Sequence, residues 1–236
     1  MRTFLVLSAM CLLFVSGHTQ SMGHFGFLIK RTHSTHLFKF PNKPFPEKGY
    51  FSFLPEYGFG FYLEIAEHPY LRVRPQLNYH VKGFNHVINY TPAGGGPNQM
   101  KTLANRFHYG SWDLLAQVHS RGRGLSPYLI LGFRGDFLLK KETESEELWK
   151  QAGHELESYQ TYRPYSFGAV AGAGIEIMGG VRLECEGNLD VLQVVRQRDL
   201  LVRNAMWSVN LGINLDRFFP GSTNPYASLP CISDSP

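Results

Sequence analysis

The chain has 236 residues, of which 43% are hydrophobic and 14% aromatic, enough for one domain with a substantial core. Its formal net charge of +4 falls further if Arg2 is removed with a leader, so the balance of charge gives no reason to expect a nucleic-acid partner. Three cysteines are too few for a disulfide framework, so packing and hydrogen bonds must hold the fold.

The first 20 residues have the pattern of a secretory signal peptide. Arg2 gives a positive start, an apolar stretch runs from Phe4 to Val15, and small and polar residues follow from Ser16 to Gln20. The apolar stretch is too short to span a bilayer as a helix, and no later segment has 18 consecutive apolar residues. We therefore expect residues 1–20 to be a signal peptide and exclude a transmembrane helix in the mature chain.

After the leader, eight short segments alternate between apolar and polar residues. Tyr57–Ile65 is typical, because Phe59, Phe61 and Leu63 alternate with glycine, tyrosine or glutamate. Since successive side chains of a strand point to opposite faces, each segment predicts a strand with one apolar face. The predicted strands are His24–Lys30, Tyr57–Ile65, Leu71–Val81, Tyr109–His119, Tyr128–Leu139, Phe167–Ile177, Val181–Val191 and Ala205–Leu215.

The connections between these segments alternate between long and short. Residues 31–56, Asn85–Arg106 and Lys140–Tyr165 are long, Leu192–Asn204 is intermediate, and the remaining connections are short. Outer-membrane barrels have the same asymmetry, with short periplasmic turns and long extracellular loops. The predicted fold is therefore all-β: an eight-stranded antiparallel up-and-down transmembrane β-barrel over residues 22–216, with a polar C-terminal tail at 217–236.

Charged residues fall on the face opposite the apolar one. In a membrane barrel this face lines the lumen, which eight strands leave just wide enough for side chains to fill. We expect a structural network of paired charges inside a closed lumen, made of Glu64, Arg72, Arg74, Asp113, Arg134, Asp136, Arg182, Glu184, Glu186 and Asp190. The alternative is a soluble periplasmic, lipocalin-like barrel in which the apolar face would line a ligand pocket.

Two sets of residues invite a chemical interpretation. Glu184, Glu186 and Asp190 share a strand face and offer acid–base chemistry if a substrate enters, but pairing with the lumen arginines is favoured. His33 and His36 form an H-x-x-H in the first long connection, where solvated loop histidines are favoured over a metal site. We expect no catalytic residue, no cofactor and no metal.

Several residue runs resemble the Bacteroidetes outer-membrane β-barrel family of PorT-like and OmpX-like eight-stranded barrels. The resemblance covers roughly residues 22 to 216 and rests on alternation and glycines, so it describes fold better than role. The chain departs from the family pattern in two places: it has a tail beyond residue 216, and its fourth predicted strand lacks a proline that is common there. The runs that carry it are Arg72–Tyr79, Ser126–Gly132, Phe167–Glu176, Arg182–Glu184 with Asn188, and Asn210–Asn214.

The expected function is that of a non-enzymatic outer-membrane barrel with structural or adhesive long loops, or an accessory part of an envelope complex, secretion included. Its expected partners are outer-membrane lipid and other envelope proteins that contact the loops or the tail, with no nucleic acid. A membrane-embedded enzyme is a further alternative, and it would need a Ser, His or carboxylate cluster at the outer rim. A solute channel is disfavoured by the crowded lumen.

Overall fold

The computed structural model describes residues 24–39, 51–68, 70–90, 97, 99–120, 124–144, 162–177, 180–194 and 201–215. The predicted signal peptide at 1–20 and tail at 217–236 lie outside these residues. Among the residues described, no helix is long and apolar enough to cross a membrane.

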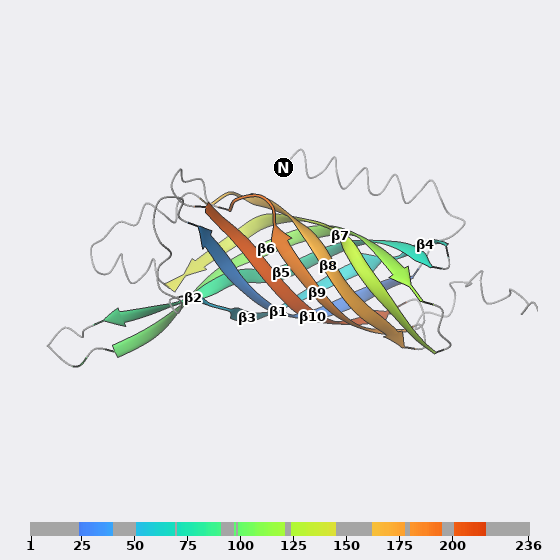
Figure 1. Cartoon of the computed structure of the whole chain (residues 1–236), viewed down its shortest axis with the longest axis horizontal. Helices are drawn as coiled ribbons and strands as arrows, with labels where there is room; N and C mark the ends of the chain where they lie inside the picture. The colour runs from blue at the N-terminus through green and yellow to red at the C-terminus, as the bar shows by residue number, and fades with distance from the viewer. Residues whose placement is uncertain are drawn as a thin grey trace, which may run out of the picture.

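Nearly all of the described chain is β-strand (Figure 1). The strands are β1 (Phe25–Lys39), β2 (Phe51–Ser52), β3 (Leu54–Leu63), β4 (Ile65–His68), β5 (Leu71–Tyr90), β6 (Gln99–His119), β7 (Leu125–Thr143), β8 (Tyr165–Ile177), β9 (Val181–Asp190) and β10 (Leu201–Asn214).

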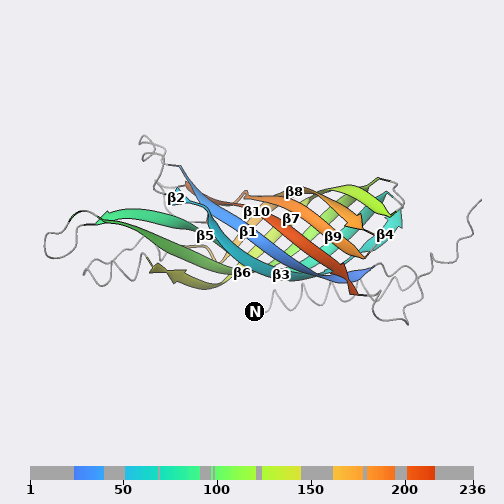
Figure 2. The same ribbon diagram turned by 90° about the horizontal axis from the view of Figure 1, so that it is seen from below.

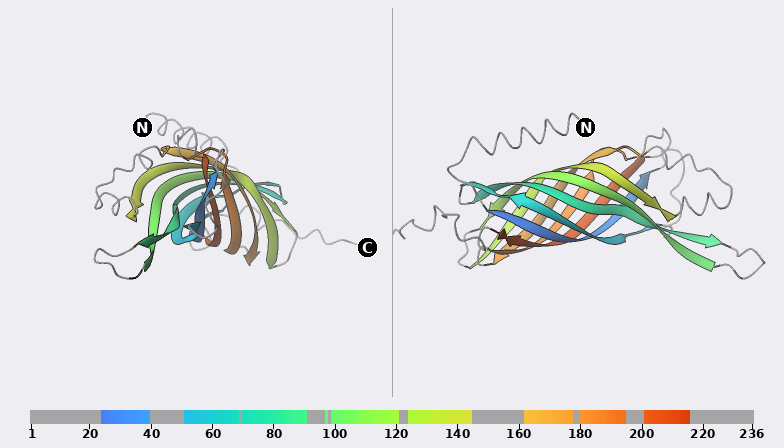
Figure 3. Two further views of the ribbon diagram at one scale, coloured as in Figure 1. Left: turned by 60° about the vertical axis from the view of Figure 1, so that its left-hand side comes forward. Right: turned by 180° about the vertical axis from the view of Figure 1, so that it is seen from behind.

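The strands close into a ring in which every neighbouring pair is antiparallel (Figure 3). The order is β5, β3, β1, β10, β9, β8, β7, β6 and back to β5. The short strands β2 and β4 pair with β5 on either side of β3, so β2, β3 and β4 together form one stave of the barrel. The prediction of an eight-stranded antiparallel barrel is confirmed.

The break between β3 and β4 lies opposite a proline. Pairing with β5 runs through Tyr62 and Gln76 and resumes at Ile65 and Val73. Pro75 falls in the gap and has no N–H to donate to the ladder. The proline thus interrupts the pairing of β5 with the β3–β4 stave, while β5 stays paired with β6 and the barrel stays closed.

The apolar side chains face outward. In β9 burial alternates strictly, with Arg182, Glu184 and Glu186 inside and Leu183 outside. Outward residues of other strands are equally exposed, as Leu77 at 66% and Leu131 at 62% show. A soluble barrel would turn this face inward, so the lipocalin-like alternative is wrong and the apolar belt is the surface that meets lipid.

The strand ends that the long connections join lie at one rim and those that the short connections join lie at the other, but several strands are longer than predicted. β5 and β6 pair out to Tyr90 and Gln99, so the predicted loop Asn85–Arg106 is largely a two-stranded ribbon that projects beyond the barrel (Figure 2). Pairing of β6 with β7 stops at Asn105. At this rim both strand faces are polar or mixed, so the alternation that marked the strands fades while the hydrogen-bond ladder continues.

Candidate functional site: the charged lumen

Inward-facing polar side chains fill the barrel. Of the ten residues predicted for the lumen, nine are buried, and Arg72 is partly exposed at the short-turn mouth. The structure brings them together with charged residues that were not predicted, namely Lys30, Lys82 and Glu176. Among the described residues, the lumen charges lie in layers along the barrel axis.

One layer is built on Arg74 and Glu184, from β5 and β9. The Arg74 guanidinium donates to both oxygens of the Glu184 carboxylate, with Nη2 2.9 Å from Oε2. The Tyr128 hydroxyl also donates to Glu184, at 2.6 Å. Gly174 faces the Tyr128 ring, where an added Cβ would lie 2.6 Å from the ring. The glycine therefore makes room for the tyrosine that completes this layer.

The next layer contains a two-pronged ion pair between Arg134 and Asp113. Nε and Nη2 of Arg134 donate to the two carboxylate oxygens at 2.8 and 2.6 Å. The Asn78 amide donates to the same carboxylate at 3.0 Å. Glu186 lies 3.5 Å from the Lys30 ammonium and 3.6 Å from Arg134, so this layer joins five strands, namely β1, β5, β6, β7 and β9. Such fork geometry is the strongest form of ion pair available to a protein.

Lys82 organises the layer toward the long-loop rim. Its ammonium donates to Asp136 at 2.7 Å, to Asn188 at 2.9 Å and to Asp190 at 3.1 Å. The Ser166 hydroxyl donates to Asp190 at 2.9 Å. One cation thus satisfies two buried carboxylates from β7 and β9, as burial of charge requires.

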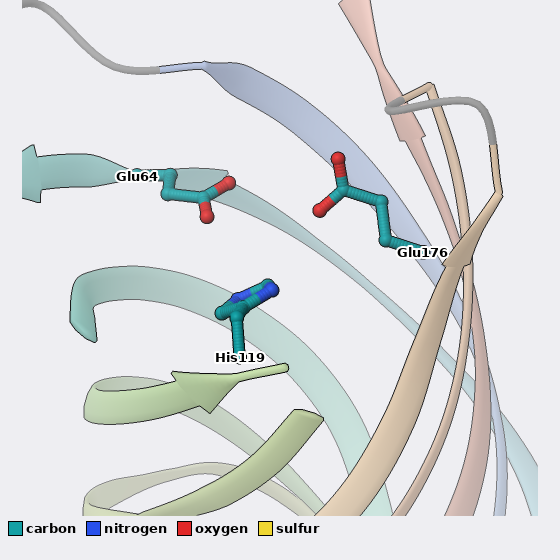
Figure 4. A group of neighbouring side chains, drawn as sticks. All are labelled: Glu64, His119 and Glu176. Carbon is teal, nitrogen blue, oxygen red and sulfur yellow. The ribbon is translucent and has the colours of Figure 1, made fainter. Parts of the chain in front are cut away.

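At the short-turn mouth, two carboxylates and a histidine converge (Figure 4). Glu64, His119 and Glu176 each offer a ligand atom, and these atoms lie within 4.8 Å of one another. Arg72 donates to Glu64 at 2.7 Å and to Glu176 at 3.0 Å. Arg182 donates to both carboxylates as well, to Glu176 at 3.2 Å.

The donor set of Glu64, His119 and Glu176 is one that a transition metal accepts. Two guanidinium groups already balance the two carboxylates, however, and a divalent cation would leave an excess of positive charge in a confined space. The arrangement is better suited to an ion-pair cluster that closes the mouth than to a metal centre.

An aromatic cluster closes the other end of the lumen. His36 is buried, with ring centroids 4.6 Å from Phe84 and 5.3 Å from Phe107. Tyr162 stacks on Phe107 at 4.5 Å and its hydroxyl lies 3.5 Å from His36 Nδ1. The expectation of solvated loop histidines is wrong, because His33 and His36 belong to β1 and point to opposite faces of that strand.

A protein-family model, described as the outer membrane protein beta-barrel domain, matches residues 23–191. The chain belongs to this family. Membership of the outer membrane protein β-barrel family places the chain in the outer membrane, in agreement with its apolar belt. The narrower resemblance to PorT-like barrels stays a prediction. None of the curated protein sequences compared with the chain matches it significantly.

Solved structures with some similarity include other small barrels. The outer membrane enzyme PagL is 9% identical, over 79% of this chain and 99% of PagL, with a TM-score of 0.42. The outer membrane protein OprG from Pseudomonas aeruginosa is 12% identical, over 82% of this chain and 96% of OprG, also with a TM-score of 0.42. Neisserial surface protein A is 9% identical, over 80% and 96%, with a TM-score of 0.38. These likenesses are too distant to transfer a function.

The three charged lumen residues that were not predicted also follow the alternation of polar and apolar residues along their strands. Lys30 ends a predicted strand and Lys82 follows one, and both lie on its polar phase. Glu176 lies on the phase of Gly172 and Gly174, which we interpreted as a small-residue face. Lys30 and Glu176 lie within predicted strands and Lys82 lies one residue beyond one, so following the polar phase of each strand to its end and one residue further would have found all three.

Proposed function

We propose that this family member is a non-enzymatic outer-membrane barrel that acts at the cell surface through its long-loop end, as an adhesive or structural contact. The observation that carries the proposal is the contrast between the two parts of the molecule. The lumen is occupied by ion pairs from wall to wall, whereas the ribbon of β5 and β6 projects clear of the barrel.

The packing of the lumen argues against a solute channel. Arg74, Arg134 and Arg182 are each 0% exposed. Arg74 and Arg182 bind carboxylates across the lumen, Glu184 and Glu64, whereas Arg134 binds Asp113 of the neighbouring strand. A continuous water path would have to pass between buried side chains that bind one another directly. A lumen built this way supports a barrel that anchors its rim rather than one that conducts.

A group on the outer wall bears on the enzymatic alternative. The Tyr79 hydroxyl lies 2.6 Å from Nδ1 of His108, and Nε2 of His108 lies 3.5 Å from the Glu142 carboxylate. Lys140 binds the same Glu142 carboxylate at 2.6 Å, so His108 shares this carboxylate with a cation. A catalytic relay needs a base oriented by a carboxylate of its own, so this group supports a non-enzymatic role.

The test combines conductance and adhesion. We expect the purified barrel to produce no current steps in planar bilayers. We expect cells that carry it to bind surfaces or other cells, and to lose that binding when Val87–Thr102 is replaced by an Asn-Gly turn. Val87 pairs with Thr102, so the cut removes the tip of the ribbon and leaves its base paired.

Stepwise conductance would contradict the closed lumen. Unchanged adhesion in the shortened variant would contradict a role of the ribbon. In that case, crosslinking of the rim to a fixed envelope protein after mild detergent extraction would identify the chain as an accessory subunit instead.

A further inference from the structure

We propose that one wall of the barrel carries a binding site for the phosphate group of an outer-leaflet lipid. The site, called here the phosphate wall, consists of Arg31, His33, Tyr57, Arg203 and Trp207. These residues lie on the outward faces of β1, β3 and β10, which are neighbours in the ring.

Register and ring contacts place four of the five residues side by side. Arg31 lies opposite Tyr57, and its guanidinium lies 4.2 Å from the centre of the Tyr57 ring. His33 lies opposite Trp207, and the two rings stack at 4.2 Å with 3° between their planes. Arg31 and His33 are two residues apart on one strand and therefore project from the same face.

The cations of the phosphate wall have no carboxylate to neutralise them. Among the described residues, no ion pair involves Arg31 or Arg203, and the outward positions of β1, β3, β9 and β10 hold no Asp or Glu. The opposite wall differs, because there Lys140 of β7 binds Glu142. Positive charge without a carboxylate partner on this wall is available to a ligand that supplies negative charge.

The position of the wall identifies the source of that charge. On β1 the outward residues Phe25, Phe27 and Ile29 are followed by the polar Arg31, His33 and Thr35, before Leu37 near the rim. Aromatic girdles mark the two interfaces of a barrel's apolar band, and the long-loop rim faces outward. Arg31 and its aromatic neighbours thus lie where lipid phosphates meet the acyl region of the outer leaflet.

The side chains offer the donors that a phosphate requires. The Arg31 guanidinium presents several N–H groups in a fixed plane, which suits a tetrahedral oxyanion. The His33 imidazole, the Trp207 indole and the Tyr57 hydroxyl each add a donor. Tyr57 is 66% exposed and Trp207 41% exposed, so both side chains can be reached from outside the barrel. Arg203 lies four residues nearer the loop rim and adds positive charge above the site.

The test uses the full mature chain folded in detergent and titrated with dioleoyl phosphatidylglycerol or dioleoyl phosphatidylcholine. Bound lipids are counted by native mass spectrometry. We expect the first phosphatidylglycerol to bind more tightly than phosphatidylcholine. Arg31→Gln should weaken it about five-fold, and adding Arg203→Gln should weaken it about five-fold again, since a basic residue near anionic lipid contributes on the order of that factor.

Lys140→Gln is the matched control, because Lys140 lies at the same rim but is paired with Glu142. It should leave lipid affinity unchanged. Heat-modifiable migration of every variant on gels shows that each barrel is folded. The proposal is overturned if wild type shows no preference for phosphatidylglycerol, or if Lys140→Gln weakens binding as much as Arg31→Gln does. It is also overturned if glycerol phosphate binds as tightly as phosphatidylglycerol, which would indicate a site for a soluble phosphate.

Discussion

Arg134 and Asp113 form a buried pair whose two members depend on each other. Arg134→Met removes both donors from the Asp113 carboxylate and leaves it with Asn78 as its hydrogen-bond donor. An unpaired buried charge costs about 3–5 kcal/mol. We expect the urea midpoint of the barrel refolded in phosphatidylcholine vesicles to fall accordingly.

The double variant Arg134→Met with Asp113→Leu distinguishes charge from packing. Because this variant has no carboxylate left buried without a partner, it should recover most of the stability that the single variant loses. A single variant as stable as wild type would show that water enters the lumen freely enough to solvate Asp113.

Gly174 and Gly187 form a matched pair of glycines on neighbouring strands. A Cβ at Gly174 would lie 2.6 Å from Tyr128, whose hydroxyl binds Glu184, whereas a Cβ at Gly187 would meet nothing closer than 3.7 Å. Gly174→Ala must displace the tyrosine and should destabilise the barrel by about 1–3 kcal/mol in the same urea titration. Gly187→Ala should cost nothing. Equal effects of the two substitutions would mean that strand propensity, not the Tyr128 contact, determines the result.

Among the elements, the apolar belt was predictable and the strand ends were not. The outward phase of Leu71, Leu77 and Leu183 follows directly from alternation, because lipid contact demands an apolar side chain at every second position. Beyond the belt that demand disappears. In the upper half of β1, Arg31 and His33 face out while Thr32 and Ser34 face in, so both faces are polar and no periodicity remains. Pairing there depends on the register with β10, which is a property of two segments and not of either alone.

The difference between properties of one segment and properties of two also explains which features of the lumen could be predicted. Which residues face inward is a local property, so all ten predicted charges were placed on the correct face. Which charge meets which is set by the closure of the ring. Arg182 and Glu64, for example, are brought together only because the start of β9 and the β3–β4 junction both lie at the short-turn mouth.

The ribbon of β5 and β6 is an element that the barrel does not need for closure. Its pairing continues past Asn105, where β7 has already ended its contact with β6. Replacing Val87–Thr102 with an Asn-Gly turn should therefore leave the urea midpoint and the heat-modifiable migration unchanged. A large loss of stability would contradict this independence and show that the tip contributes to the aromatic cluster at the rim.

For the whole molecule, the orientation in the membrane follows from the belt and the loops. Cys185 faces outward on β9 between Leu183 and Gly187, within the belt, whereas Lys101 is exposed on the ribbon. In a background with Cys231→Ser, a membrane-impermeant maleimide applied to intact cells should label Lys101→Cys and leave Cys185 unlabelled, because acyl chains cover it. Denaturation should expose Cys185 to the reagent. Labelling of Cys185 in intact cells would mean that this wall faces water, and labelling of Lys101→Cys only after permeabilisation would reverse the orientation on which the phosphate wall depends.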